Sequence, residues 1–120
     1  MSTFSINIEN ETLKNTNYRK VINTNKTQQI VLMSLQPGED IPIEIHSNTS
    51  QFIRVEKGTG VAFIGKLATK KIKLKDGVSL TVPPKTWHYI KNTSQKDDLK
   101  LYSIYSPPEH PPNKVNKRQP

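Results

Sequence analysis

Two histidines and the polar residues spaced around the first of them are the side chains best suited to chemistry in this sequence. Glu44 and His46 stand two positions apart in the segment IPIEIH, and Gln51 follows five positions later. Residues two apart on a strand point to the same side of the sheet, so Glu44 and His46 can reach one common ligand. The second histidine, His88, must be brought to them from a distant part of the chain.

A metal ion is the ligand that fits such a set. The sequence contains no cysteine, which excludes thiolate ligands as well as disulfide bonds. Two imidazole nitrogens, one carboxylate and one amide oxygen suit zinc, manganese, iron, cobalt or nickel. The sequence therefore predicts that Glu44, His46 and Gln51 can share a divalent transition-metal ion, with a further ligand from another part of the chain. The alternative is a site without metal, in which the two histidines are hydrogen-bonded residues of the core.

Short apolar runs between turn residues indicate an all-β protein. A chain of 120 residues is long enough for one packed core and too short for two. Strands rich in Ile, Val, Phe and Tyr are expected at residues 29–35, 41–46, 51–57, 61–65, 70–75 and 78–82, from residue 87, and at 99–105. Eight such strands favour a sandwich or a closed barrel, and no helix of three turns is expected.

Two of the connections are expected to be antiparallel hairpins, one between the second and third of these strands and one between the fifth and sixth. Residues 47–50 and 76–77 supply the turn residues. The first hairpin would place Gln51 across from the strand that carries Glu44 and His46, at a distance of about 5 Å.

The barrel is expected to occupy residues 29–106 as a single domain. Residues 1–28 are expected to form an N-terminal arm, with one short edge strand among the first 18 residues. Residues 107–120 are rich in proline and lysine and are expected to be a flexible tail. His110 lies between prolines in this tail, and we expect it to be exposed to solvent.

The net charge of +8 raises the question of nucleic-acid binding. Lysines concentrated at residues 70–75 surround Ile72 and Leu74, a pattern typical of a strand with one solvent-facing side. No aromatic residues are interleaved with these lysines, so nucleic acid is not expected as a partner. A small-molecule ligand or substrate is expected instead.

Membrane insertion and secretion are not indicated. The sequence has no signal-peptide pattern and no apolar run of about 20 residues, which favours a soluble cytoplasmic protein without a membrane partner. Trp87 and Tyr89 flank His88 and should face away from it. A homodimer contact through these two aromatic residues is compatible with that orientation.

The polar residues also fall into two motifs by which this sequence resembles the cupin superfamily. The first motif is Gly, five residues, His, one residue, His, three or four residues, Glu, six residues and Gly. This chain has Gly38, Glu44, His46, Gln51 and Gly58 at those spacings. Glu44 replaces the first His of the family pattern, and Gln51 replaces its Glu.

The second cupin motif is Gly, five residues, Pro, one residue, Gly, two residues, His, three residues and Asn. Here Gly77, Pro83, His88 and Asn92 match, and Lys85 replaces the second Gly. The resemblance implies a small cupin with a double-stranded β-helix, or jelly-roll barrel. It also implies that the two motifs together form the metal site, so that Glu44, His46, Gln51 and His88 are the expected ligands of one divalent transition-metal ion.

We therefore expect a metal-binding cupin that acts on a small polar or sugar-like molecule by isomerase, epimerase or dioxygenase chemistry. The ligand set is similar to that of the type I mannose-6-phosphate isomerases, whose zinc is held by a Gln, two His and a Glu, with Gln and Glu in swapped motif positions. The alternative is a non-catalytic cupin that binds a sugar or another small molecule. No catalytic residue is identified, although Tyr102 or Tyr105 could approach the pocket as an acid.

Overall fold

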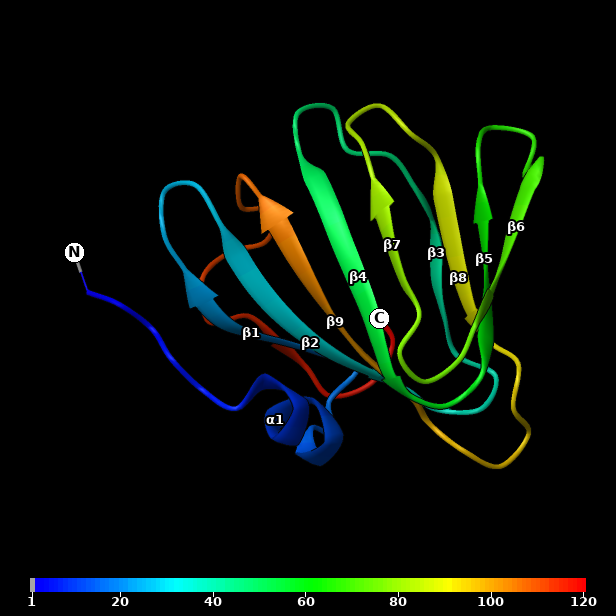
Figure 1. Cartoon of the computed structure of the whole chain (residues 1–120), viewed down its shortest axis with the longest axis horizontal. Coiled ribbons are helices and arrows are strands. Elements are labelled where there is room, and N and C mark those ends of the chain that lie inside the picture. The colour runs from blue at the N-terminus through cyan, green and yellow to red at the C-terminus, as the bar shows by residue number, and fades with distance from the viewer. Residues whose placement is uncertain (1) are drawn as a thin grey trace.

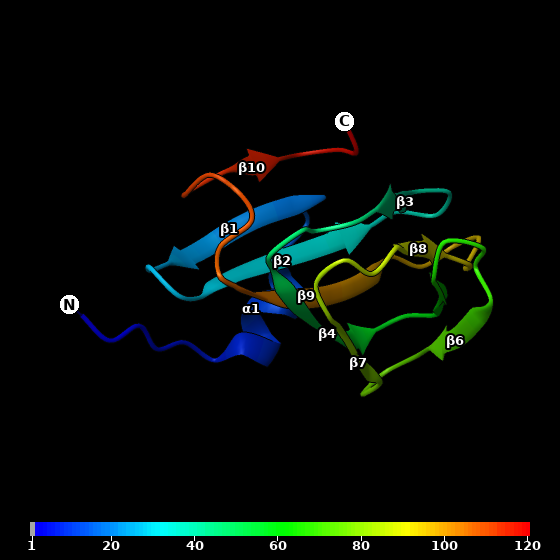
Figure 2. The same cartoon turned by 90° about the horizontal axis from the view of Figure 1, so that it is seen from above.

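Two antiparallel sheets surround a common interior in the computed structural model, which describes residues 2–120 (Figure 1 and Figure 2). The larger sheet has the order β10 (Val115–Asn116), β1 (Arg19–Thr24), β2 (Gln29–Leu35), β9 (Leu99–Ser106), β4 (Ser50–Lys57) and β7 (Ser79–Val82). The smaller sheet has the order β3 (Asp40–Glu44), β8 (His88–Asn92), β5 (Gly60–Ile64) and β6 (Lys70–Leu74). The prediction of an all-β fold is confirmed.

Alternating side chains on β4 and β9 build the interior. On β4 the buried positions are Gln51, Ile53 and Val55, and their partners on β9 are Tyr105, Ser103 and Leu101 in that order. Because side chains alternate across a strand, these residues all point to the inner face of the sheet. The interior is therefore apolar at the Val55 end and polar at the Gln51 end, which is where the candidate site lies.

Both predicted hairpins are wrong, although most of the strand positions are right. β3 pairs with β8, whereas β4 pairs with β7 and β9 in the other sheet. In the same way β6 pairs with β5, and β7 pairs with β4. The turn residues reverse the chain as expected, but each connection crosses from one sheet to the other because both strands bury their apolar faces in the shared interior.

The edge strand expected among the first 18 residues is also wrong, because residues Ile8–Lys14 form a two-turn helix, α1. The side chain of Asn7 caps it by accepting a hydrogen bond from the Asn10 amide at 3.0 Å. The buried side chain of Thr12 faces the larger sheet, and the helix packs against β2, β4 and β9. A helix of seven residues is too short to produce a recognisable 3.6-residue pattern.

The C-terminal segment, residues 107–120, is docked on the barrel, and we call it the C-terminal strap. Its strand β10 pairs with β1, with Asn116 opposite Arg19. The ring of His110 packs edge-on against Tyr105, with 5.2 Å between ring centroids. The expectations of a loose tail and of a solvent-exposed His110 are therefore wrong, since prolines prevent a central strand but allow docking through the residues between them.

The lysine-rich segment forms strand β6, as its pattern predicted, and β6 lies at the edge of the smaller sheet. Lys70, Lys71 and Lys73 are exposed, whereas Leu74 is buried. Charged side chains on an edge strand hinder its pairing with other chains, which gives these lysines a structural role. No helix among residues 2–120 is both long and apolar enough to span a membrane.

Gly58, the last residue of the first motif, should tolerate no side chain. Its φ is +108°, and a Cβ there would lie 2.6 Å from the backbone oxygen of Asp98. Gly38 has a similar φ of +87° but nothing within 4 Å of such a Cβ. We expect Gly38→Ala to lower the free energy of unfolding by about 1–2 kcal/mol, and Gly58→Ala to cost about 1–3 kcal/mol more. Urea denaturation measures the free energy of unfolding of both variants. Equal losses in the two variants would contradict a clash between the new Cβ of Gly58→Ala and the Asp98 oxygen.

Burial, reinforced by the positive charge of Arg19, lowers the pKa of His110 from 6.5 to about 4. The unfolded chain therefore takes up a proton before the folded protein does, so stability present above pH 6.5 is lost as the pH falls toward 4. After allowance for solvent screening we expect a loss on the order of 1 kcal/mol. The melting temperature of metal-free protein should fall more steeply over this range than that of His110→Phe. If the melting temperatures of the two proteins fell equally with pH, the ring of His110 would be exposed to solvent.

Candidate metal centre

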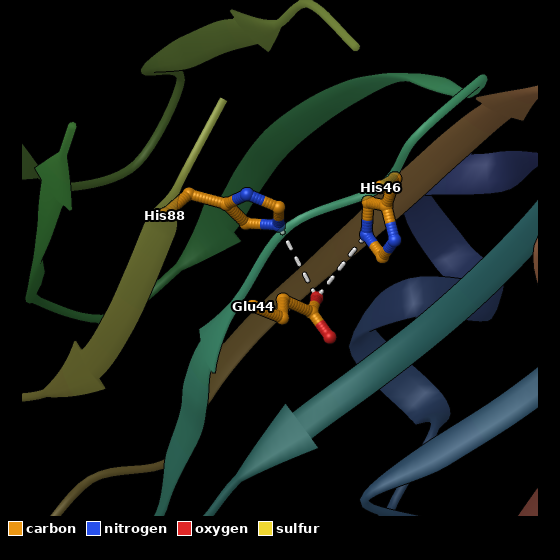
Figure 3. A group of neighbouring side chains, drawn as sticks. All are labelled: Glu44, His46 and His88. Carbon is orange, nitrogen blue, oxygen red and sulfur yellow. Dashed lines mark hydrogen bonds and ion pairs between the residues drawn. The ribbon is translucent and has the colours of Figure 1, made fainter. Parts of the chain in front are cut away.

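Glu44, His46 and His88 converge at the polar end of the interior, as Figure 3 shows. Glu44 ends β3 and stands opposite His88, the first residue of β8, in the strand register. The Oε1 atom of Glu44 lies 3.2 Å from Nε2 of His88 and 3.4 Å from Nε2 of His46. One potential ligand atom from each of the three residues lies within 4.8 Å of the other two, a grouping that could hold a metal ion.

The orientation of His88 is set by a backbone carbonyl. Its Nδ1 lies 3.0 Å from the oxygen of Thr86. Because a carbonyl only accepts, Nδ1 must carry the hydrogen and donate it. In the neutral ring Nε2 then presents a lone pair to the carboxylate of Glu44, and two electron-rich atoms face each other unless a proton or a cation lies between them.

His46 is arranged in a similar way, with a carboxylate as its outer partner. Its Nδ1 lies 3.3 Å from Oε1 of Glu109, which belongs to the C-terminal strap. Its Nε2 is buried and has no hydrogen-bond partner, since the approach to Glu44 at 3.4 Å lacks hydrogen-bond geometry. Nδ1 of His88 is therefore hydrogen-bonded to a backbone oxygen and Nδ1 of His46 faces a carboxylate, and both rings direct Nε2 toward Glu44.

The site is strongly polarised around an ionised carboxylate. Burial raises the pKa of Glu44, but the close contacts and charge of His46 and His88 outweigh it and lower the pKa to about 2. The neighbouring Glu44 carboxylate raises the pKa of His46, against the opposing effect of burial. The Glu44 side chain is 32% exposed, whereas those of His46 and His88 are 6% and 1% exposed. The cluster thus opens to solvent on the Glu44 side.

Gln51 lies beside this cluster and is almost completely buried. Its amide nitrogen donates to Ser103 Oγ at 3.0 Å and to the Tyr105 hydroxyl at 3.2 Å. Its Oε1 atom is buried without a partner, and the amide also contributes to the raised pKa of His46, which places it next to that ring. A buried carbonyl oxygen without a partner costs about 1–3 kcal/mol, and a cation would satisfy it. The donor set present here therefore fits a metal ion.

The aromatic residues divide between the two faces of the barrel wall. Tyr89 donates to Asp40 Oδ2 at 2.7 Å and packs near Phe63 rather than near the site, as expected for a neighbour of His88. Tyr102 packs near Phe52, so of the two tyrosines considered as acids only Tyr105 approaches the site. Burial raises the pKa of Tyr105, which keeps its hydroxyl protonated.

Sequence reasoning missed two outer partners of the histidines. Thr86 acts through its backbone oxygen, which leaves no trace in residue type. Glu109 is separated from His46 by more than sixty positions and lies in a segment expected to be loose. Only the docking of the strap brings it to the site.

Comparison with known proteins identifies relatives along almost the whole chain. The Cupin domain family matches residues 31–105. The uncharacterized protein L612 of Acanthamoeba polyphaga mimivirus is 50% identical over 117 residues, which cover 98% of this chain and 73% of that protein. The uncharacterized protein YrkC of Bacillus subtilis is 43% identical over 111 residues, covering 90% of this chain and 59% of that protein.

A solved structure shares the architecture closely. The crystal structure of BH2720 from Bacillus halodurans superimposes with a TM-score of 0.93 at 39% sequence identity. The alignment covers 98% of this chain and 90% of that one, so it includes α1 and the C-terminal strap as well as the barrel. With both sheets, both motifs and the family match in agreement, the chain belongs to the cupin family and folds as a single-domain double-stranded β-helix.

Proposed function

We propose that this protein binds one divalent transition-metal ion through Glu44, His46, Gln51 and His88 and uses it as a small metalloenzyme. One observation carries the proposal: the Nε2 atoms of two imidazoles point at the same carboxylate oxygen, beside a buried amide oxygen without a partner. Zinc, manganese, iron, cobalt and nickel all accept such nitrogen and oxygen donors.

A metal accounts for this arrangement better than protonated core histidines do. A proton on either Nε2 would relieve one contact with Glu44 but would leave Gln51 Oε1 without a donor of its own. A single cation offers one charge to all four groups at once. Burying a carboxylate beside neutral imidazoles is costly without such a charge.

The proposed chemistry is isomerisation or epimerisation of a small polar or sugar-like molecule, or a dioxygenase reaction on one. A bound metal ion would supply a Lewis acid for vicinal oxygens of such a molecule. Glu44 is the residue placed to move a proton, because its carboxylate is ionised and is the partly exposed member of the cluster. Tyr105 holds the Gln51 amide in place through its protonated hydroxyl.

Removing single ligands should abolish or weaken metal binding. We expect metal-depleted wild-type protein to take up one equivalent of zinc and to gain melting temperature, because only the folded state offers the assembled site. His88→Ala should bind no zinc at micromolar concentration. Gln51→Leu should bind at least about tenfold more weakly, while its metal-free form loses little stability since an orphaned oxygen is removed. Elemental analysis and calorimetric titration measure these effects.

Gln95→Leu is the matched control, because Gln95 is exposed in a loop far from the interior. It should bind zinc like the wild type. Full zinc binding by His88→Ala would contradict the proposed ligand set. If zinc raised the melting temperatures of His88→Ala and Gln51→Leu as much as that of the wild type, the zinc would be bound at a different site.

Turnover separates an enzyme from a binding protein. Protein loaded in turn with zinc, manganese or iron should convert a member of a panel of sugars, sugar phosphates and enediols, with Glu44→Gln inactive and Glu9→Gln fully active. Product analysis with an oxygen electrode distinguishes the reactions, since only a dioxygenase consumes oxygen. A ligand that binds tightly and is recovered unchanged with every metal would assign the non-catalytic alternative.

A further inference from the structure

The C-terminal strap is fixed to the barrel by a fully buried amide. Gln29 on β2 is 0% exposed. Its Oε1 accepts from the backbone amides of Glu109 and His110 at 3.1 and 2.9 Å, and its Nε2 donates to the His110 oxygen at 2.7 Å and to Thr24 Oγ1 at 3.0 Å. Both lone pairs and both hydrogens of the amide are used. The backbone at residues 109–110 therefore has one position relative to β2.

The strap is held beyond this clamp as well. The backbone amides of Val21 and Tyr18 donate to the oxygens of Lys114 and Lys117 at 2.9 and 3.2 Å. Near the chain end, the Gln119 side chain exchanges hydrogen bonds with Asp40. Because the segment is anchored on both sides of residues 111–113, the backbone of Glu109 cannot move away from the site without breaking several partly buried hydrogen bonds.

The clamp places the Glu109 carboxylate 3.3 Å from Nδ1 of His46. For His88 the corresponding acceptor is the Thr86 oxygen, which belongs to the barrel itself. Without Glu109, the neutral ring of His46 could instead keep its hydrogen on Nε2, facing the Glu44 oxygen 3.4 Å away. That tautomer would occupy the nitrogen needed for a metal.

We propose that Glu109 is a positioning residue of the metal centre, which accepts the Nδ1 hydrogen of His46 and so keeps the Nε2 lone pair directed at Glu44 and Gln51. The inference rests on the proposed function for the metal itself. The match to the Cupin domain family ends at residue 105, so this contribution comes from a segment outside the matched domain. Outer partners of ligating histidines are typically worth about 10–100-fold in metal affinity.

The tautomer of His46 tests the inference without any metal. Long-range ¹H–¹⁵N NMR of the metal-free full chain, at a pH well above the pKa of the ring, should show hydrogen on Nδ1 in the wild type. In Glu109→Ala the hydrogen should move largely to Nε2. Glu109→Gln, which keeps an acceptor oxygen, should retain the wild-type tautomer, and Glu9→Ala on the exposed face of α1 is the matched control.

Zinc affinity is the second measurement, made on the same variants by competition with a chromophoric chelator. We expect Glu109→Ala to bind about 10–100-fold more weakly, Glu109→Gln to bind less than tenfold more weakly, and Glu9→Ala to match the wild type. Gln29→Leu, which removes the clamp and leaves all four proposed ligands intact, should shift both tautomer and affinity in the direction of Glu109→Ala.

The outcomes separate the two proposals. A wild-type protein that binds no zinc would overturn the proposed function, while the His46 tautomer would still decide the role of Glu109. Normal zinc binding together with an unchanged tautomer in Glu109→Ala would overturn the inference and leave the metal site standing. Melting temperatures of the four variants show whether any loss reflects unfolding rather than ring orientation.

Discussion

One electrostatic constraint organises this molecule: two imidazole Nε2 atoms and an ionised carboxylate share a small, largely buried space. Nδ1 of His88 is hydrogen-bonded to the Thr86 oxygen and Nδ1 of His46 lies 3.3 Å from the Glu109 carboxylate, so each ring directs Nε2 toward Glu44. Glu44 stays ionised because both histidines lower its pKa. Electron-rich atoms grouped in this way cost free energy unless a proton or a cation lies between them, which is the physical basis of the proposed metal site.

The barrel remains stable despite this polar cluster because the rest of its interior is apolar and buried. The pairing of β4 with β9 runs from Val55 and Leu101, both fully buried, to Gln51 and Tyr105 at the site. The alternation that makes the core therefore also delivers the polar residues, without any special backbone conformation. Glu44, Gln51 and His88 lie on strands, which hold side chains more rigidly than loops do, whereas His46 lies in the loop after β3.

Segments outside the matched domain complete the structure on two sides. Helix α1 covers the outer face of the larger sheet, and the C-terminal strap adds β10 to β1. The clamp at Gln29 converts a proline-rich segment into a fixed wall of the site, where Glu109 faces His46 and the ring of His110 packs on Tyr105. The cupin barrel supplies the proposed ligands, and the strap supplies the orientation of one of them.

The sequence by itself determined most of the strand positions and the residue types of the site, because side-chain alternation and metal-ligand chemistry are local properties that can be read from the order of residues. It did not indicate the strands β1 and β10. The spacing of Glu44, His46 and Gln51, and that of His88 and Asn92, were enough to indicate the two cupin motifs. Only the tertiary structure decided which sheet each strand joined, since a turn reverses the chain without choosing its partner. It also decided the docking of Glu109, because a buried amide at Gln29 and a distant backbone segment recognise each other only once the barrel has formed.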